Sequence, residues 1–204
     1  MSTHKAAAAL TAEQVLARLE AGNERFVRGE ARFPTVQKDI LAELAKGQQP
    51  YATIIGCSDS RVPPELVFQQ GIGDVFSVRV AGNVIDTDDL GSLEYATKAV
   101  GVRLIVVMGH TECGAVKGAI DDVKLGNLTE LLSKIRQAAA SAGAPGTSKD
   151  AAYVDKIAEA NVRLSMRELR EKSPVMKELI DSGKTGLVGA MYDVKTGKVA
   201  FLAD

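Results

Sequence analysis

The sequence has few of the side chains most often found in catalytic or metal sites. Among its 204 residues it has no tryptophan, two cysteines and two histidines. Aromatic residues make up only 4% of the chain. The formal net charge is −1, which gives no bulk attraction to nucleic acid or to an anionic membrane.

Long apolar runs are also absent. No stretch approaches the roughly 20 apolar residues needed to cross a bilayer, so we expect no membrane insertion. The segment Met1–Leu10 has one lysine and a short alanine run, too weak for a complete signal peptide. We therefore expect a cytoplasmic location, or a periplasmic one if a signal peptide has been removed.

The composition that remains is that of an ordinary globular protein, with 46% hydrophobic and 25% charged residues. We find no repeat and no low-complexity linker, and we expect a single domain over residues 1–204. Within it, residues 1–10 are expected to be disordered and residues 11–47 to form an N-terminal helical arm. A capping box at Thr11 and Gln14 starts the first helix, which ends near Gly29, and a second helix follows over Thr35–Lys46.

Three short apolar runs then predict strands, at Tyr51–Gly56, Val75–Val80 and Leu104–Gly109. The last is rich in β-branched residues, as is typical of a strand buried on both faces of a parallel sheet. A helix capped by Asp88 or Asp89 is expected between the second and third strands.

The rest of the chain is mainly helical as far as Asp181, with a break at residues 141–148. Strand character returns at Lys184, and residues 195–197 form the turn of a closing hairpin. The alternation predicts an α/β fold with a mainly parallel central β-sheet flanked by helices.

Both cysteines lie near the ends of predicted strands. Cys57 directly follows the first strand, and His110 and Cys113 follow the third. Because the carboxyl ends of parallel strands meet at one edge of a sheet, these side chains are expected to lie close together. Two cysteines can form a disulfide, remain as buried thiols or bind a metal. With a histidine beside them they supply three ligands of the kind that zinc prefers, and leave a fourth position.

Asp59 and Arg61 leave two possibilities for that fourth position. The Asp59 carboxylate can complete a closed, structural metal site. Alternatively, Arg61 can hold it in a forked ion pair away from the metal, where it can accept a hydrogen bond from bound water. The second arrangement favours catalysis.

Together these two segments resemble the β-class carbonic anhydrases, and in particular a bacterial branch of that family. The family pattern is Cys-x-Asp-x-Arg followed further along the chain by His-x-x-Cys-Gly, and here it runs from Cys57 to Arg61 and from His110 to Gly114. The resemblance implies one Zn²⁺ per subunit, held by Cys57, His110 and Cys113, with Asp59 as fourth ligand in a closed state. It also implies reversible hydration of carbon dioxide to bicarbonate and a proton, by attack of zinc-bound hydroxide, with Asp59 and Arg61 as catalytic residues.

The same resemblance implies a substrate pocket formed by Gln48, Phe76, Tyr95 and Gly114, partly contributed by a second subunit. A homodimer or homotetramer is therefore expected, with the N-terminal helix packed on the partner subunit. Some members have a second, inhibitory bicarbonate site that needs a tryptophan. Ile54 stands at that position here, so this site is not expected.

Two other functions remain compatible with these motifs. A hydrolase of the same fold, acting on carbon disulfide or carbonyl sulfide, shares the same metal ligands. A non-catalytic, zinc-stabilised binding protein is the other possibility, and it predicts Asp59 on the metal at every pH.

Overall fold

The computed structural model describes residues 10–30, 38–143 and 145–203. The expectation of disorder at residues 1–10 therefore lies outside the described residues, except for Leu10, and so does the predicted start of the second helix at residues 35–37. Along the described parts of the chain, no helix is both long and apolar enough to span a membrane.

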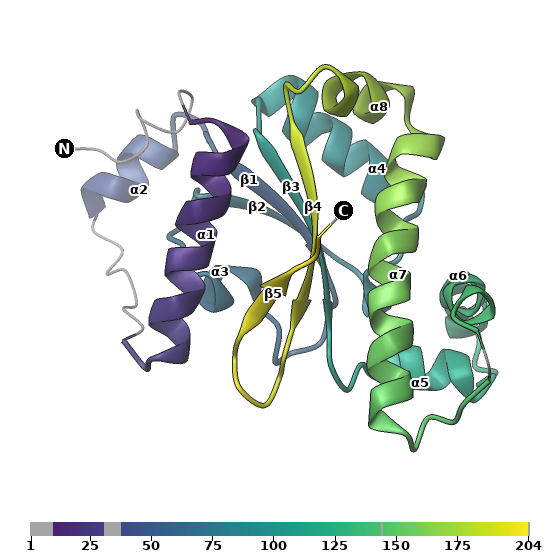
Figure 1. The fold of residues 1–204 in the computed structure, drawn as a ribbon. Helices are drawn as coiled ribbons and strands as arrows, with labels where there is room; N and C mark the ends of the chain where they lie inside the picture. The colour runs from purple at the N-terminus through teal and green to yellow at the C-terminus, as the bar shows by residue number, and fades with distance from the viewer. Residues whose placement is uncertain (1–9, 31–37, 144, 204) are drawn as a thin grey trace.

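A five-stranded sheet forms the centre of the molecule (Figure 1). Its strands lie in the order β2-β1-β3-β4-β5, where β1 to β4 are parallel and β5 is antiparallel to β4. The mainly parallel sheet and the closing hairpin are therefore confirmed. The strand bounds are β1 Ala52–Gly56, β2 Val75–Arg79, β3 Leu104–His110, β4 Gly186–Tyr192 and β5 Val199–Phe201.

Helices cover both faces of this sheet, as Figure 1 shows. On one face lie α1 and α3, and on the other lie α4, α7 and α8. Their bounds are α1 Ala12–Val27, α3 Pro64–Val67, α4 Thr87–Glu94, α7 Ala151–Lys172 and α8 Pro174–Asp181.

The central strand β3 shows why the sheet is buried on both sides. All seven of its residues are buried, and alternate side chains point to opposite faces. Val106 packs in the cluster that contains α1, whereas Ile105 and Val107 pack against α7. A continuous apolar run is the sequence expected for a strand in this position.

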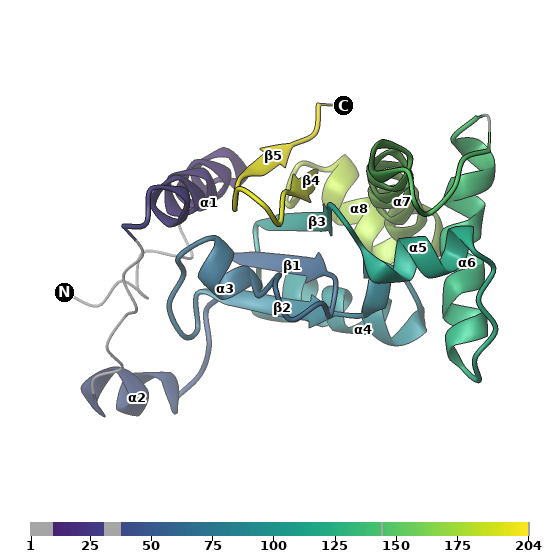
Figure 2. The same cartoon turned by 90° about the horizontal axis from the view of Figure 1, so that it is seen from below.

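Two helices, α5 (Gly114–Ile120) and α6 (Leu128–Ser141), pack with α7 beyond the carboxyl ends of β1 and β3. A short helical turn at Ala81–Asn83 follows β2 and contacts both α5 and α7. In contrast, α2 (Lys38–Leu44) lies apart from the sheet in Figure 2.

The first helix begins with the predicted capping box, because Thr11 and Gln14 exchange hydrogen bonds. Its buried residues Val15 and Leu19 pack on the sheet of the same chain. That this helix also packs on a second subunit stays a prediction. Such packing would use the face of α1 that points away from the sheet.

The predicted cap of α4 was wrong by two or three residues. Asp86 is the N-cap, and Asp89 is the residue three positions later that completes the capping box. The helix then continues as a wider π-helical segment, Tyr95–Val100, and ends at Gly101, which has a positive φ of 91°.

Candidate metal centre

The structure brings the three predicted metal ligands together. Cys57 follows β1, His110 ends the neighbouring strand β3, and Cys113 is the N-cap residue of α5. Their ligand atoms all lie within 4.8 Å of one another, and all three residues are buried. The two cysteines form no disulfide.

Backbone N–H groups surround the sulfur of Cys57. The amides of Gly82 and Asp59 point at its Sγ, at 3.2 Å and 3.4 Å. The neighbouring Cys113 thiol is the largest cause of the lowering of the Cys57 pKa to about 4. The same contact raises the pKa of Cys113 in turn. The two amides that point at the Cys57 sulfur stabilise its thiolate, the form in which a cysteine binds a metal.

His110 has one satisfied and one unsatisfied ring nitrogen. Its Nδ1 lies 2.9 Å from the Thr111 carbonyl oxygen, which fixes the tautomer with the proton on Nδ1. Its Nε2 is one of three buried side-chain N or O atoms without a hydrogen-bond partner among the described residues. Buried polar atoms are nearly always paired, so an unpaired nitrogen facing two thiols needs an explanation. A metal ion bound through Nε2 supplies one, and this donor set fits zinc.

Asp59 lies beside this cluster but is held by Arg61. The guanidinium donates to both carboxylate oxygens, at 2.9 Å and 2.7 Å, and the Arg61 amide donates to Oδ1 at 2.9 Å. These bonds keep the pKa of Asp59 well below its usual range. The Asp59 Oδ2 is 4.0 Å from His110 Nε2. Of the two arrangements that the sequence allowed, this is the open one, in which Arg61 holds Asp59 away from the metal position.

Two further residues fix the Cys57 loop, and sequence reasoning gave neither of them this role. Arg79, the last residue of β2, donates to the carbonyl oxygens of Cys57 at 3.1 Å and of Asp59 at 2.7 Å. Gly82 has a φ of +69°, and a Cβ there would lie 2.5 Å from the Ile135 side chain. Arg79 ends β2 and Gly82 lies three residues further on, so their place at the end of a strand next to β1 is the signal by which the sequence could have indicated them.

The predicted pocket residues do not join the cluster within this chain. Phe76 pairs with Thr53, four residues before Cys57, which corresponds to about 13 Å along the strand. Its ring contacts Tyr95, with centroids 6.1 Å apart, and Tyr95 is 53% exposed. Gln48 is exposed and precedes β1, at the opposite end from Cys57. Only Gly114 adjoins a ligand, and a Cβ there would meet nothing within 4 Å.

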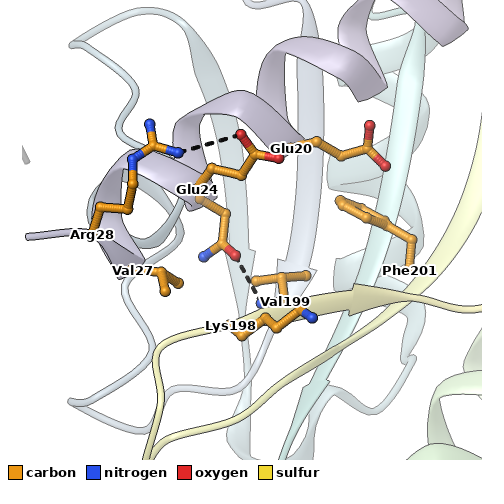
Figure 3. A pocket seen from close by; sticks show the side chains of 8 residues that line it. Glu20, Glu24, Val27, Arg28, Lys198, Val199 and Phe201 are labelled. Carbon is orange, nitrogen blue, oxygen red and sulfur yellow. Dashed lines mark hydrogen bonds and ion pairs between the residues drawn. The ribbon is translucent and has the colours of Figure 1, made fainter. Parts of the chain in front are cut away.

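A separate pocket of about 650 Å³ lies between α1 and β5 (Figure 3). Its polar side chains are largely occupied, because Arg28 pairs with Glu24 and Asn23 hydrogen-bonds the backbone at Val67, Gly197 and Val199. None of the predicted site residues lines this pocket. The Cys57 cluster therefore remains the candidate for chemistry.

Comparison with known proteins points to the same cluster. A sequence model of the family described as carbonic anhydrase matches residues 52–199, which include all three candidate ligands. Carbonic anhydrase 2 of Mycobacterium tuberculosis is 40% identical over 185 residues, which cover 88% of this chain and 87% of that protein. A carbonic anhydrase of Mycolicibacterium smegmatis is 36% identical over 186 residues, covering 89% of this chain and 88% of the relative.

Solved structures extend this likeness to the fold. The β-carbonic anhydrase CcaA superposes with a TM-score of 0.75 at 26% identity, covering 93% of this chain and 95% of that one. One of two tetrameric β-carbonic anhydrases from Sordaria macrospora gives the same TM-score and identity, covering 93% and 98%. With the family match, the sequence relatives and the shared fold in agreement, the chain belongs to the β-class carbonic anhydrases and is an enzyme of that kind.

Proposed function

We propose that the protein catalyses the zinc-dependent, reversible hydration of carbon dioxide to bicarbonate and a proton. The observation that carries the proposal is the unpaired, buried Nε2 of His110, which faces the sulfur atoms of Cys57 and Cys113 beside an ionised Asp59. This arrangement lies in a chain of the carbonic anhydrase family.

Cys57, His110 and Cys113 would hold one Zn²⁺ per subunit. When bound, this ion supplies a water molecule acidic enough to act as a nucleophile near neutral pH. Arg61 holds the Asp59 carboxylate turned towards itself, through the two hydrogen bonds from its guanidinium. The carboxylate then lies next to the cluster as a hydrogen-bond acceptor. It can orient the reacting water by accepting a hydrogen bond from the water's O–H. The same contact with Arg61 keeps Asp59 from closing the metal shell.

The substrate pocket would be completed by a second copy of the chain. Gln48, Phe76 and Tyr95 lie away from the cluster of their own chain, and a partner subunit can bring its copies to it. Gln48 would donate a hydrogen bond to the developing bicarbonate, while the rings of Phe76 and Tyr95 form an apolar wall. We therefore propose a homodimer, or a homotetramer like the Sordaria relatives. From the sequence alone we propose that it acts in the cytoplasm, or in the periplasm if a signal peptide has been removed.

Stopped-flow measurement of carbon dioxide hydration, on protein of known zinc content, tests the proposal from about pH 6.5 to about pH 9. We expect turnover that is proportional to bound zinc and rises with pH. Absence of turnover with one zinc bound per chain would refute the proposal. In that case, turnover of carbon disulfide or carbonyl sulfide would identify a related hydrolase, and no turnover of either would leave a zinc-stabilised binding protein.

A further inference from the structure

Helix α7 approaches both metal-ligand loops with polar side chains. Its inward face is mostly apolar, and includes Val154, Ile157, Val162 and Leu169. Two polar residues, Asn161 and Ser165, lie on the same face and are each only 1% exposed. A buried polar side chain destabilises the fold unless it is hydrogen-bonded, so the partners of these two residues show what they do.

Asn161 supports the turn that lies against Cys57. Its Nδ2 donates to the Gly82 carbonyl oxygen at 2.7 Å, and the Ser165 hydroxyl donates to the Asn83 carbonyl oxygen at 2.9 Å. Gly82 in turn directs its N–H at the Cys57 Sγ, at 3.2 Å. The position of this N–H donor therefore depends on a hydrogen bond from α7.

Asp155, also on α7, supports the other ligand loop. Its Oδ1 accepts a hydrogen bond from the Glu112 amide at 3.2 Å. Glu112 lies between His110 and Cys113 and has a φ of +58°, a left-handed conformation that is rare for a residue other than glycine. Such a conformation persists only where the surroundings hold it, and the Asp155 carboxylate is one such restraint.

We propose that Asp155 and Asn161 are positioning residues, through which α7 sets the two cysteine ligands at the distance a metal requires. Neither residue is itself a ligand. Asp155 acts on Cys113 through the Glu112 turn, and Asn161 acts on Cys57 through Gly82. The inference rests on the proposed metal at this cluster and goes beyond it, because it assigns roles to residues outside the ligand motifs.

The test is metal affinity, measured on purified variants by competition with a chelator. Groups that orient metal ligands typically contribute 10- to 100-fold in affinity. We expect Asp155→Ala and Asn161→Ala to weaken zinc binding by about that factor. Asp155→Asn should bind nearly as wild type, because its amide oxygen can still accept the Glu112 N–H. Glu159→Gln is the matched control on the same helix, since Glu159 pairs only with the exposed Arg163 among the described residues.

A spectroscopic measurement separates positioning from general loss of structure. With Co²⁺ in place of zinc, the thiolate-to-metal absorption should change in Asp155→Ala and Asn161→Ala, and return in Asp155→Asn. Wild-type affinity and spectrum in Asp155→Ala would overturn the inference, and this variant decides the matter if Asn161→Ala does not fold. A wild type that binds zinc but hydrates no carbon dioxide would refute the proposed function alone.

Discussion

The metal cluster and the predicted pocket walls differ in almost every physical respect. Cys57, His110 and Cys113 are at most 4% exposed and lie at the ends of central strands. Tyr95 is 53% exposed, and Gln48 lies in an exposed loop at the other end of β1. A metal site needs ligands held within a few tenths of an ångström, which buried strand ends provide. One chain therefore brings the three candidate ligands together, but it does not bring Gln48, Phe76 and Tyr95 to them.

The surface around β2 is where we propose that the second copy binds. In the described parts of the chain, β2 is an edge strand without a neighbour on its outer side. Exposed apolar side chains lie on the elements beside it, among them Leu66, Ile72 and Tyr95. An apolar surface beside an open strand edge is typical of a protein–protein interface. Of the predicted pocket residues, Phe76 and Tyr95 thus lie on a surface suited to a second copy, and the metal ligands do not.

The largest effect is expected when the cluster itself is broken. Cys113→Ser replaces a thiolate by a hydroxyl, which is a poor zinc ligand, so the protein should lose its metal. Activity should fall by more than the roughly 100-fold that follows loss of a group hydrogen-bonded to a ligand. Zinc content and turnover are measured on the same sample, and full zinc occupancy in this variant would show that the ligand assignment is wrong.

Asp59→Ala should separate metal binding from catalysis. The three ligands remain, so zinc content should stay near one per chain. Loss of the acceptor that orients the reacting water should lower turnover by roughly 10²- to 10⁴-fold. Glu20→Gln, an exposed substitution in the groove between α1 and β5, serves as the control. Near-normal turnover in Asp59→Ala would remove this carboxylate from the mechanism.

A smaller effect is expected when the second region is disturbed. Ile72 is 55% exposed beside β2, and Ile72→Asp should place a charge in the proposed interface between subunits. Zinc should stay bound while the oligomer dissociates and turnover falls roughly tenfold. Leu125→Asp is the matched control, because Leu125 is 66% exposed on a different part of the surface. Light scattering gives the mass, and a monomeric wild type with full activity would contradict the proposed pocket.

The same contrast shows what could be predicted from the sequence. Strands β1 and β3 and the three candidate ligands follow from local patterns, because apolar runs and the residues after them are contiguous in the chain. The N-cap of α4 was misplaced because Asp86, Asp88 and Asp89 are all acceptable caps. The structure selects Asp86, since Asp89 then falls at the third helical position and can bond back to it.

The supporting contacts could not be predicted, because they join residues far apart in the chain. Arg79 and Cys57 are 22 residues apart, and Asn161 and Gly82 are 79 apart. Nothing in the local sequence of α7 distinguishes Asn161 from an asparagine exposed to solvent. Its role depends on how the helix packs over the strand ends, which only the tertiary structure specifies.

The smallest expected effect is a pH dependence of the free energy of unfolding, caused by the ion pair between Arg61 and Asp59 at the rim of the cluster. Because Arg61 lowers the pKa of Asp59 in the folded state, the pair stabilises the protein fully above the unfolded pKa of about 3.9. That contribution is lost as the pH falls through the lower, folded pKa. Arg61 is 52% exposed, so solvent screening limits the contribution to about 0.5–1 kcal/mol.

Arg61→Gln removes the charge that holds Asp59 and so tests this pair directly. Urea unfolding of metal-free protein should show the variant less stable than wild type at about pH 7, with a difference that shrinks below about pH 4. A difference that stays constant down to about pH 3 would mean that Arg61 stabilises the loop by packing instead of by its charge. In that case the charge of Arg61 would not hold the Asp59 carboxylate, and the open arrangement of the metal centre would need another cause.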